Sequence, residues 1–133
     1  MIDSLIKDLV ITQIGTKKIC FDLRNLVAIV NPKNILETFL GEFSFNGTNY
    51  SIIDFYNIHK LEAPKDEENT RFLLFELNRS FIAVMVDRVL EIISLKESIN
   101  IGDVDKENSH YVVKWDGREF LVPDLQEYER IKT

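Results

Sequence analysis

Cysteine, proline, glycine and long apolar runs are all scarce in this chain of 133 residues. The single cysteine, Cys20, has no partner for a disulfide within the chain. Its place in an alternating apolar pattern predicts a small buried side chain rather than a reactive thiol. With only three prolines and five glycines, the composition is that of a globular protein rather than a disordered one.

Signals for membranes and nucleic acids are also missing. The longest apolar run, 81–86, has the length of a strand, whereas a membrane-spanning helix needs about 20 residues. No charged-then-apolar leader occurs at the start, so we expect a cytoplasmic protein without direct membrane insertion. Sixteen basic and twenty-two acidic side chains give a net charge of −6 without a basic stripe, so nucleic acid is not an expected partner.

Residue groups typical of catalytic, metal or phosphate-binding sites are missing as well. The two histidines, His59 and His110, lie in different halves of the chain without an acid or thiol at ligand spacing, which argues against a metal site or a histidine-activated nucleophile. The glycines form no phosphate-cradling loop, and no serine stands in a nucleophile elbow. We therefore expect no catalytic residues, no metal and no cofactor, and interpret the chain as a binding module rather than an enzyme.

A β-hairpin motif is present, and it occurs twice. In 41–55, two alternating apolar runs flank Asn46-Gly47, a dipeptide that favours a two-residue type I′ turn. The stretch 111–125 has the same plan 70 residues further along, with Asp116-Gly117 in the turn. A second pair of segments, 19–30 and 82–93, aligns apolar residue on apolar residue at an offset of 63. An insertion of seven residues in the second copy reconciles the two offsets.

This internal repeat predicts the domain organisation. We expect a single domain over 1–133, with a first half at about 7–61, an exposed linker at 62–69 and a second half at about 70–131. Short strands at close spacing, with little helix between them, indicate an all-β fold of one or two small barrels sharing a core.

The individual elements follow from local patterns. We predict strands at 7–14, 17–23, 26–30, 70–77, 81–86 and 89–94, a helical turn at 33–38, short helices at 56–61 and 125–131, and a polar loop at 96–108. Four aspartates stand where strands end, and we expect their carboxylates to bond backbone amides, two of them as helix caps. These aspartates are Asp22, Asp54, Asp87 and Asp124.

Several phrases resemble one known family. Phe-Asp-Leu-x-x-Leu-x-x-Ile occupies 21–29, Gly-x-Phe-x-Phe-x-Gly occupies 41–47, Ile-Ile-Asp-Phe occupies 52–55, and Met-Val-Asp-Arg-Val-Leu-Glu-Ile-Ile occupies 85–93. Together they resemble the CheW-like domain of bacterial chemotaxis coupling proteins, over about 7–128. The resemblance implies two five-stranded SH3-like barrels packed on a shared hydrophobic core, with a short C-terminal helix.

The same resemblance implies a function and a set of sites. It implies a non-catalytic adaptor that couples chemoreceptors to the chemotaxis histidine kinase, with the kinase regulatory domain and the cytoplasmic receptor tip as partners. Exposed strand edges would suit docking of another barrel, and a hydrophobic groove between the halves would receive the receptor's helical hairpin. The positions implied in partner binding are Leu26, Gly41, Asn46, Gly47 and Ala83, with Val86 and Val89 as groove wall.

One departure from the family pattern keeps alternatives open. Family hairpins usually read Asn-Leu-Arg-Gly, with the arginine as a partner-binding anchor, whereas this chain has Ser44-Phe45-Asn46-Gly47, which lacks the planar cation. The alternative is a divergent scaffold that assembles with the kinase or with itself but has lost receptor binding. A small enzyme or ligand-binding barrel would require a polar-lined cavity. For Leu26, the sequence does not separate a groove contact from a core role.

Overall fold

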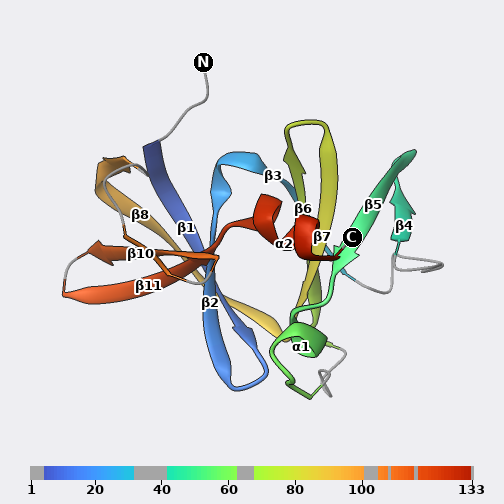
Figure 1. Ribbon diagram of the computed structural model, residues 1–133, viewed down its shortest axis with the longest axis horizontal. Coiled ribbons are helices and arrows are strands. Elements are labelled where there is room, and N and C mark those ends of the chain that lie inside the picture. The colour runs from blue at the N-terminus through green and yellow to red at the C-terminus, as the bar shows by residue number, and fades with distance from the viewer. Residues whose placement is uncertain are drawn as a thin grey trace.

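The structure is a computed structural model that describes residues 5–31, 42–62, 68–100, 105–107, 109–115 and 117–132. Strands dominate it (Figure 1). They are β1 Leu5–Ile14, β2 Lys17–Asp22, β3 Leu26–Val30, β4 Glu42–Phe45, β5 Thr48–Ile53, β6 Arg71–Leu77, β7 Ser80–Val86, β8 Arg88–Asn100, β9 Asp105–Glu107, β10 His110–Trp115 and β11 Arg118–Pro123. The helical elements are η1 Leu23–Asn25, a 3-10 turn, α1 Phe55–Ile58 and α2 Leu125–Lys132.

The strands form two barrels that stand side by side in Figure 1. The β6 barrel is a five-stranded sheet in the order β3-β6-β7-β5-β4. The β1 barrel combines two three-stranded sheets, β2-β1-β8 and β11-β10-β9, with β11 lying against β2. The all-β, double-barrel fold expected from the repeat is therefore confirmed.

Each barrel contains strands from both halves of the sequence. The hairpin β1–β2 from the first half is joined by β8 from the second, and the hairpin β6–β7 from the second half is joined by β3 from the first. The closing hairpins cross over in the same way, because β4–β5 attaches to β7 whereas β10–β11 lies beside β2. The two halves are thus interleaved rather than folded one after the other.

The interleaving is symmetric at the level of single residues. Leu26 of β3 pairs with Phe75 of β6. The equivalent pair joins Val89 of β8, 63 positions after Leu26, to Thr12 of β1, 63 positions before Phe75. Each of the two strands then has a bulge at the next residue, Val27 in β3 and Leu90 in β8. The alignment of 19–30 with 82–93 therefore predicts a structural equivalence that includes the irregularities.

The predicted hairpin turns are formed by left-handed residues. Asn46 and Gly47 have φ angles of 50° and 79°, so both central positions are in the conformation that a type I′ turn requires. In the second closing hairpin, Gly117 has φ 73°. The hairpin β6–β7 turns through Asn78 and Arg79 at φ 42° and 72°, although neither is glycine.

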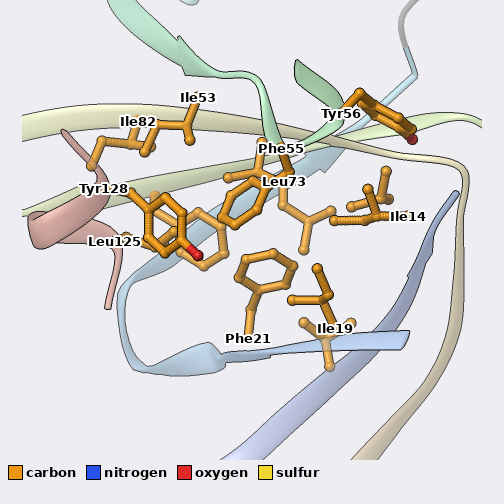
Figure 2. Packing of buried hydrophobic residues seen from close by; sticks show 14 residues of the cluster. Ile14, Ile19, Phe21, Ile53, Phe55, Tyr56, Leu73, Ile82, Leu125 and Tyr128 are labelled. Carbon is orange, nitrogen blue, oxygen red and sulfur yellow. The ribbon is translucent and has the colours of Figure 1, made fainter. Parts of the chain in front are cut away.

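A shared core lies between the two barrels and belongs to neither alone (Figure 2). Phe21 of β2 is its centre, with its ring 5.9 Å from that of Phe55 and 5.7 Å from that of Phe75. The strands at this junction are apolar on both faces, because one face packs in the shared core and the other inside a barrel. The buried members of the shared core are Val10, Ile14, Ile19, Phe21, Ile53, Phe55, Tyr56, Leu73, Phe75, Ile82, Val84, Val86, Leu125 and Tyr128.

All four strand-end aspartates bond backbone amides, as predicted. Asp22 accepts a hydrogen bond from the Arg24 amide at 3.0 Å. Asp54 and Asp124 cap α1 and α2, accepting from amides three residues ahead at 3.0 and 3.4 Å. Asp87 accepts from the Gly15 amide at 3.0 Å and from the Tyr56 hydroxyl. Asp87 therefore ties the turn between β1 and β2 to α1 and to the start of β8.

Two predictions about local structure need comment. The polar loop expected over 96–108 is wrong for 96–100 and 105–107, because β8 continues to Asn100 and β9 occupies Asp105–Glu107, and the rest of that range lies outside the described residues. Pairing with β1 and β10 supplies the hydrogen bonds that hold these polar residues in strands, so tertiary context overrides composition there. The helical turn predicted at 33–38 lies outside the described residues, as does most of the linker.

Candidate functional site

Two strips of exposed apolar side chains mark the candidate interaction site. The β3 strip consists of Val27 and Ile29, which are 52% and 38% exposed. The β8 strip consists of Leu90 and Ile92, which are 36% and 57% exposed. The members are equivalent in the repeat, because Leu90 and Ile92 follow Val27 and Ile29 by 63 residues.

Strand pairing shows which face of β3 carries its strip. Ile29 pairs with Leu73 of β6, which is fully buried in the shared core, and directly paired residues lie on the same face of a sheet. Ala28 and Val30 point to the opposite face and pack inside the β6 barrel. The β3 strip is therefore an outward continuation of the shared-core face.

The same argument places the β8 strip. Ile92 pairs with Val10 of β1, which is buried in the shared core, whereas Ile93 and Leu95 pack inside the β1 barrel. Leu90 is the bulge residue at the position that Val27 holds in β3. Both strips thus extend the shared core outward, one along each of the two strands that cross between barrels.

Charged side chains near the two strips differ. Beside the β3 strip, Arg24 pairs with Asp22, and both side chains are mostly covered. On β8, Glu91 pairs with Ile11 of the β1-barrel core, so its side chain lies on the face opposite to Ile92, where its carboxylate is 3.3 Å from Arg118 and both side chains are about half exposed. Exposed pairs of this kind contribute little to stability.

The predicted partner-binding residues fall in three settings. Leu26 and Val89 are half-buried beside the strips and pack against the shared core. Asn46 and Gly47 are exposed at the tip of the β4–β5 hairpin. Ala83 and Val86 are fully buried, the first inside the β6 barrel and the second in the shared core, and Gly41 lies outside the described residues.

The predicted positions therefore divide into residues with exposed surface and buried packing residues. Ala83 and Val86 have no exposed surface, so in this structure they contribute packing rather than a surface for a partner. Val27, Ile29, Leu90 and Ile92 were not among the predicted positions, although the sequence contains a signal for them. In the alignment at an offset of 63, both pairs are apolar in strands whose neighbouring residues supply the barrel cores.

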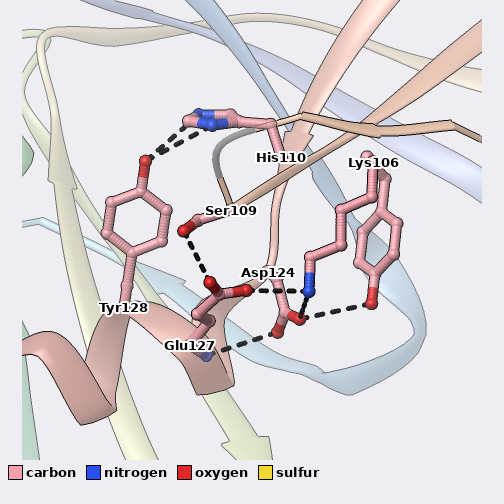
Figure 3. A network of polar contacts seen from close by, with 7 residues as sticks. Lys106, Ser109, His110, Asp124, Glu127 and Tyr128 are labelled. Atoms are coloured by element: carbon pink, nitrogen blue, oxygen red, sulfur yellow. Dashed lines mark hydrogen bonds and ion pairs between the residues drawn. The ribbon is translucent and has the colours of Figure 1, made fainter.

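A polar network fastens α2 to the β1 barrel (Figure 3). The Lys106 ammonium lies 3.0 Å from Asp124 and 2.7 Å from Glu127. Ser109 donates to Glu127 at 2.9 Å, and Tyr111 donates to Asp124 at 3.2 Å. Hydrogen bonds from Lys106 and Ser109 lower the pKa of Glu127, and those to Glu127 and Asp124 raise the pKa of Lys106. The network holds the start of the helix.

Metal-ligand groups, membrane-spanning helices and the single cysteine can each be assessed within the described ranges. No group of three or more metal-ligating side chains occurs there. No helix in the described part of the chain is long and apolar enough to cross a membrane. Cys20 is buried, and burial raises the pKa of its thiol to about 11.

Comparison with known proteins gives a family. Together, the fold and the exposed strips define a double β-barrel protein of the SH3-like class with an apolar surface. A model of the CheW-like domain matches residues 8–130. The chain therefore belongs to the CheW-like family. No curated protein matches it significantly.

A solved structure supports the fold. The scaffolding protein TtCheW from Thermoanaerobacter tengcongensis is similar at a TM-score of 0.65 and 15% identity, over 89% of this chain and 88% of that one. At this identity the likeness concerns the fold alone. Family membership supports a scaffold or adaptor role in chemotaxis signalling.

Proposed function

We propose that this protein is a non-catalytic cytoplasmic adaptor that couples chemoreceptors to the chemotaxis histidine kinase. The observation that carries the proposal is the pair of exposed apolar strips on the shared-core face, at equivalent positions of the repeat. Two large apolar side chains on each of two crossing strands are costly to leave in water without a partner.

The proposed receptor partner fits the strips chemically. The receptor tip is a helical hairpin, and an amphipathic helix presents apolar side chains at intervals of three and four residues to an apolar surface. In a regular strand, residues two apart lie about 6.6 Å from one another, close to the 5–6 Å spacing of such helix neighbours.

The proposed kinase contact uses a different surface. The strand β4 is an outer strand of the five-stranded sheet, and the turn at Asn46-Gly47 forms the end of its hairpin. An outer strand offers backbone groups to another β-barrel, which is the nature of the proposed kinase regulatory domain. Separate surfaces let the adaptor hold both partners at once.

Charge substitution tests the receptor surface. We expect Val27→Asp and Ile92→Asp each to weaken binding of a receptor-tip fragment at least tenfold in a calorimetric titration, because a carboxylate would have to be desolvated in the contact. Leu121→Asp is the matched control, since Leu121 on β11 is similarly exposed, at 42%, and lies outside the strips. Unchanged receptor binding by both strip variants would contradict the proposal.

A second candidate function keeps the kinase or self-assembly role without receptor binding. It is motivated by Asn46, which occupies the place of the family arginine. Arg79 takes up φ 72° in the β6–β7 turn, so this chain accommodates an arginine in the left-handed conformation that Asn46 has. Receptor binding that appears only in Asn46→Arg would favour this second function, whereas receptor binding by the unmodified protein would remove its motive.

A further inference from the structure

Three aromatic side chains meet where α2 crosses the junction between the barrels. The Tyr128 hydroxyl lies 3.4 Å from Nε2 of His59, and 3.4 and 3.3 Å from Nδ1 and Nε2 of His110. The two imidazole rings are themselves 6.0 Å apart, centre to centre. The two histidines are 51 positions apart in the sequence, and the fold brings both to one hydroxyl.

The three side chains come from three separate elements. His59 is the C-cap residue of α1, which follows β5 of the β6 barrel. His110 begins β10 of the β1 barrel, and Tyr128 belongs to α2 (Figure 3). The cluster therefore spans both barrels and the helix between them. Phe55 extends it into the shared core, because its ring stacks on His59 at 5.8 Å and lies 4.7 Å from Tyr128.

Hydrogen-bond chemistry makes this arrangement sensitive to protons. A hydroxyl both donates and accepts, so it satisfies two imidazoles when one offers an unprotonated nitrogen and the other an N–H. When His59 is protonated, both of its ring nitrogens carry protons, so the ring can no longer accept a hydrogen bond from the Tyr128 hydroxyl. Tyr128 itself stays neutral, because burial and then the Glu127 charge raise the pKa of its hydroxyl to about 12.

We propose that His59, Tyr128 and His110 form a proton-sensitive clasp that holds α2 across the junction at neutral pH and loosens as His59 takes up a proton. This inference concerns the joining of the barrels and holds whichever partner the exposed strips bind. As a consequence, acidification weakens the attachment of α2 at the junction before it disrupts the barrel cores.

The charges that face His59 act in the same direction. Burial lowers the pKa of His59, and Lys17 on β2 and His110 on β10 lower it further through their positive charge. From α2, Tyr128 faces the ring as a neutral group, while Glu127 is engaged by Lys106 and Ser109. The described groups around His59 thus disfavour its protonated form.

The sign of the resulting pH dependence follows from linkage. Since the pKa of His59 is lower in the folded protein than its ordinary value of 6.5, the unfolded chain binds more protons between these two values. The stabilisation is complete above about pH 6.5 and is lost as the pH falls through the folded-state pKa. Histidine side chains are the groups that titrate in this range.

Nuclear magnetic resonance of the imidazole signals tests the electrostatics. We expect His59 to titrate below 6.5, and to titrate higher in Lys17→Gln and in His110→Gln. The matched control is Lys18→Gln, which removes a neighbouring cation that is not among the causes of the shift and should leave the titration unchanged. A His59 that titrates at or above 6.5, or that responds equally to Lys17→Gln and Lys18→Gln, would overturn the proposal.

Urea unfolding at pH 7.5 and pH 5.5 tests the clasp itself. Tyr128→Phe keeps the packed ring and removes the hydroxyl, so we expect its urea midpoint to fall below that of the unmodified protein at pH 7.5 and by less at pH 5.5. His59→Gln should lose part of the midpoint decrease on acidification. A Tyr128→Phe loss of the same size at both pH values, together with an unchanged pH dependence in His59→Gln, would show ordinary packing and overturn the clasp.

Discussion

The two barrels have the same strand register and differ in how they close. In the β6 barrel, β5 forms a parallel ladder with β7, so the sheet is continuous through five strands. In the β1 barrel, β11 lies against β2, and these two fully described strands form no ladder. Pro123, which has no N–H, stands in β11 where Ile53 stands in β5, 70 residues earlier.

The difference shows what the repeat preserves. Register is set by which side chains must point inward, and a slip of one residue would expose an entire apolar face. Equivalent positions such as Cys20 and Ala83 therefore both pack inside a barrel, whereas Ile19 and Ile82 both pack in the shared core. Closure instead depends on individual backbone donors, and it has diverged.

The largest expected effect comes from the shared core. Phe21→Ala should lower the free energy of unfolding by about 3–5 kcal/mol, because it leaves a cavity against Phe55 and Phe75. The equivalent change in the other hairpin, Val84→Ala, should cost about 2 kcal/mol because it deletes two methyl groups. Urea unfolding followed by fluorescence and circular dichroism gives both values. Separate transitions for the two barrels would contradict a single shared core.

The second effect breaks the symmetry at Asp87. Its carboxylate accepts from the Gly15 amide and the Tyr56 hydroxyl, whereas the equivalent position in the first half holds Arg24. Asp87→Ala should lower the free energy of unfolding, measured with urea, by about 1–3 kcal/mol, because it leaves two donors without their acceptor. The exposed neighbour Arg88 provides the control. Arg88→Ala should change the free energy of unfolding by no more than about 0.5 kcal/mol. Equal stability of the two variants would refute the anchoring role of Asp87.

A smaller effect compares two turns. Gly47 has φ 79° and open space around it, so Gly47→Ala should destabilise by about 1 kcal/mol through backbone conformation alone. Arg79 adopts φ 72° without being glycine, so Arg79→Gly should stabilise by up to about 1 kcal/mol. Thermal unfolding of both variants measures the pair. The same direction of change in both would be inconsistent with this explanation.

The smallest effect concerns the barrel interiors. Because burial raises the pKa of Cys20 to about 11, its thiol should resist a disulfide-exchange reagent at pH 8 until the protein unfolds. In a Cys20→Ala background, Ala83→Cys should be equally resistant, since Ala83 is fully buried at the equivalent position. Rapid labelling of the native protein at either position would show that its barrel opens.

Much of the fold follows from the sequence, because turn residues and apolar alternation act locally. The Asn46-Gly47 turn and the capping by Asp54 and Asp124 were predictable in this way. The exchange of strands between halves was not, because β3 and β8 satisfy the same apolar pattern whichever hairpin they join. The later part of β8 also escaped prediction, since its polar residues are held by pairing with β1.

The candidate site was only partly predictable for a related reason. An apolar strand residue looks the same in the sequence whether it faces a core or the solvent. Val86 and Ile92 are both apolar and both lie near the junction, yet the first is fully buried and the second is 57% exposed. Strand pairing, which the sequence does not reveal, separates them.

The central claim is that the two strips receive the receptor tip. The most direct measurement follows the methyl resonances of valine, leucine and isoleucine during titration with a receptor-tip fragment. We predict that the signals of Val27, Ile29, Leu90 and Ile92 shift or broaden, while those of Leu121 and of buried Leu74 do not. Binding that perturbs Leu121 and leaves all four strip residues unchanged would contradict the claim.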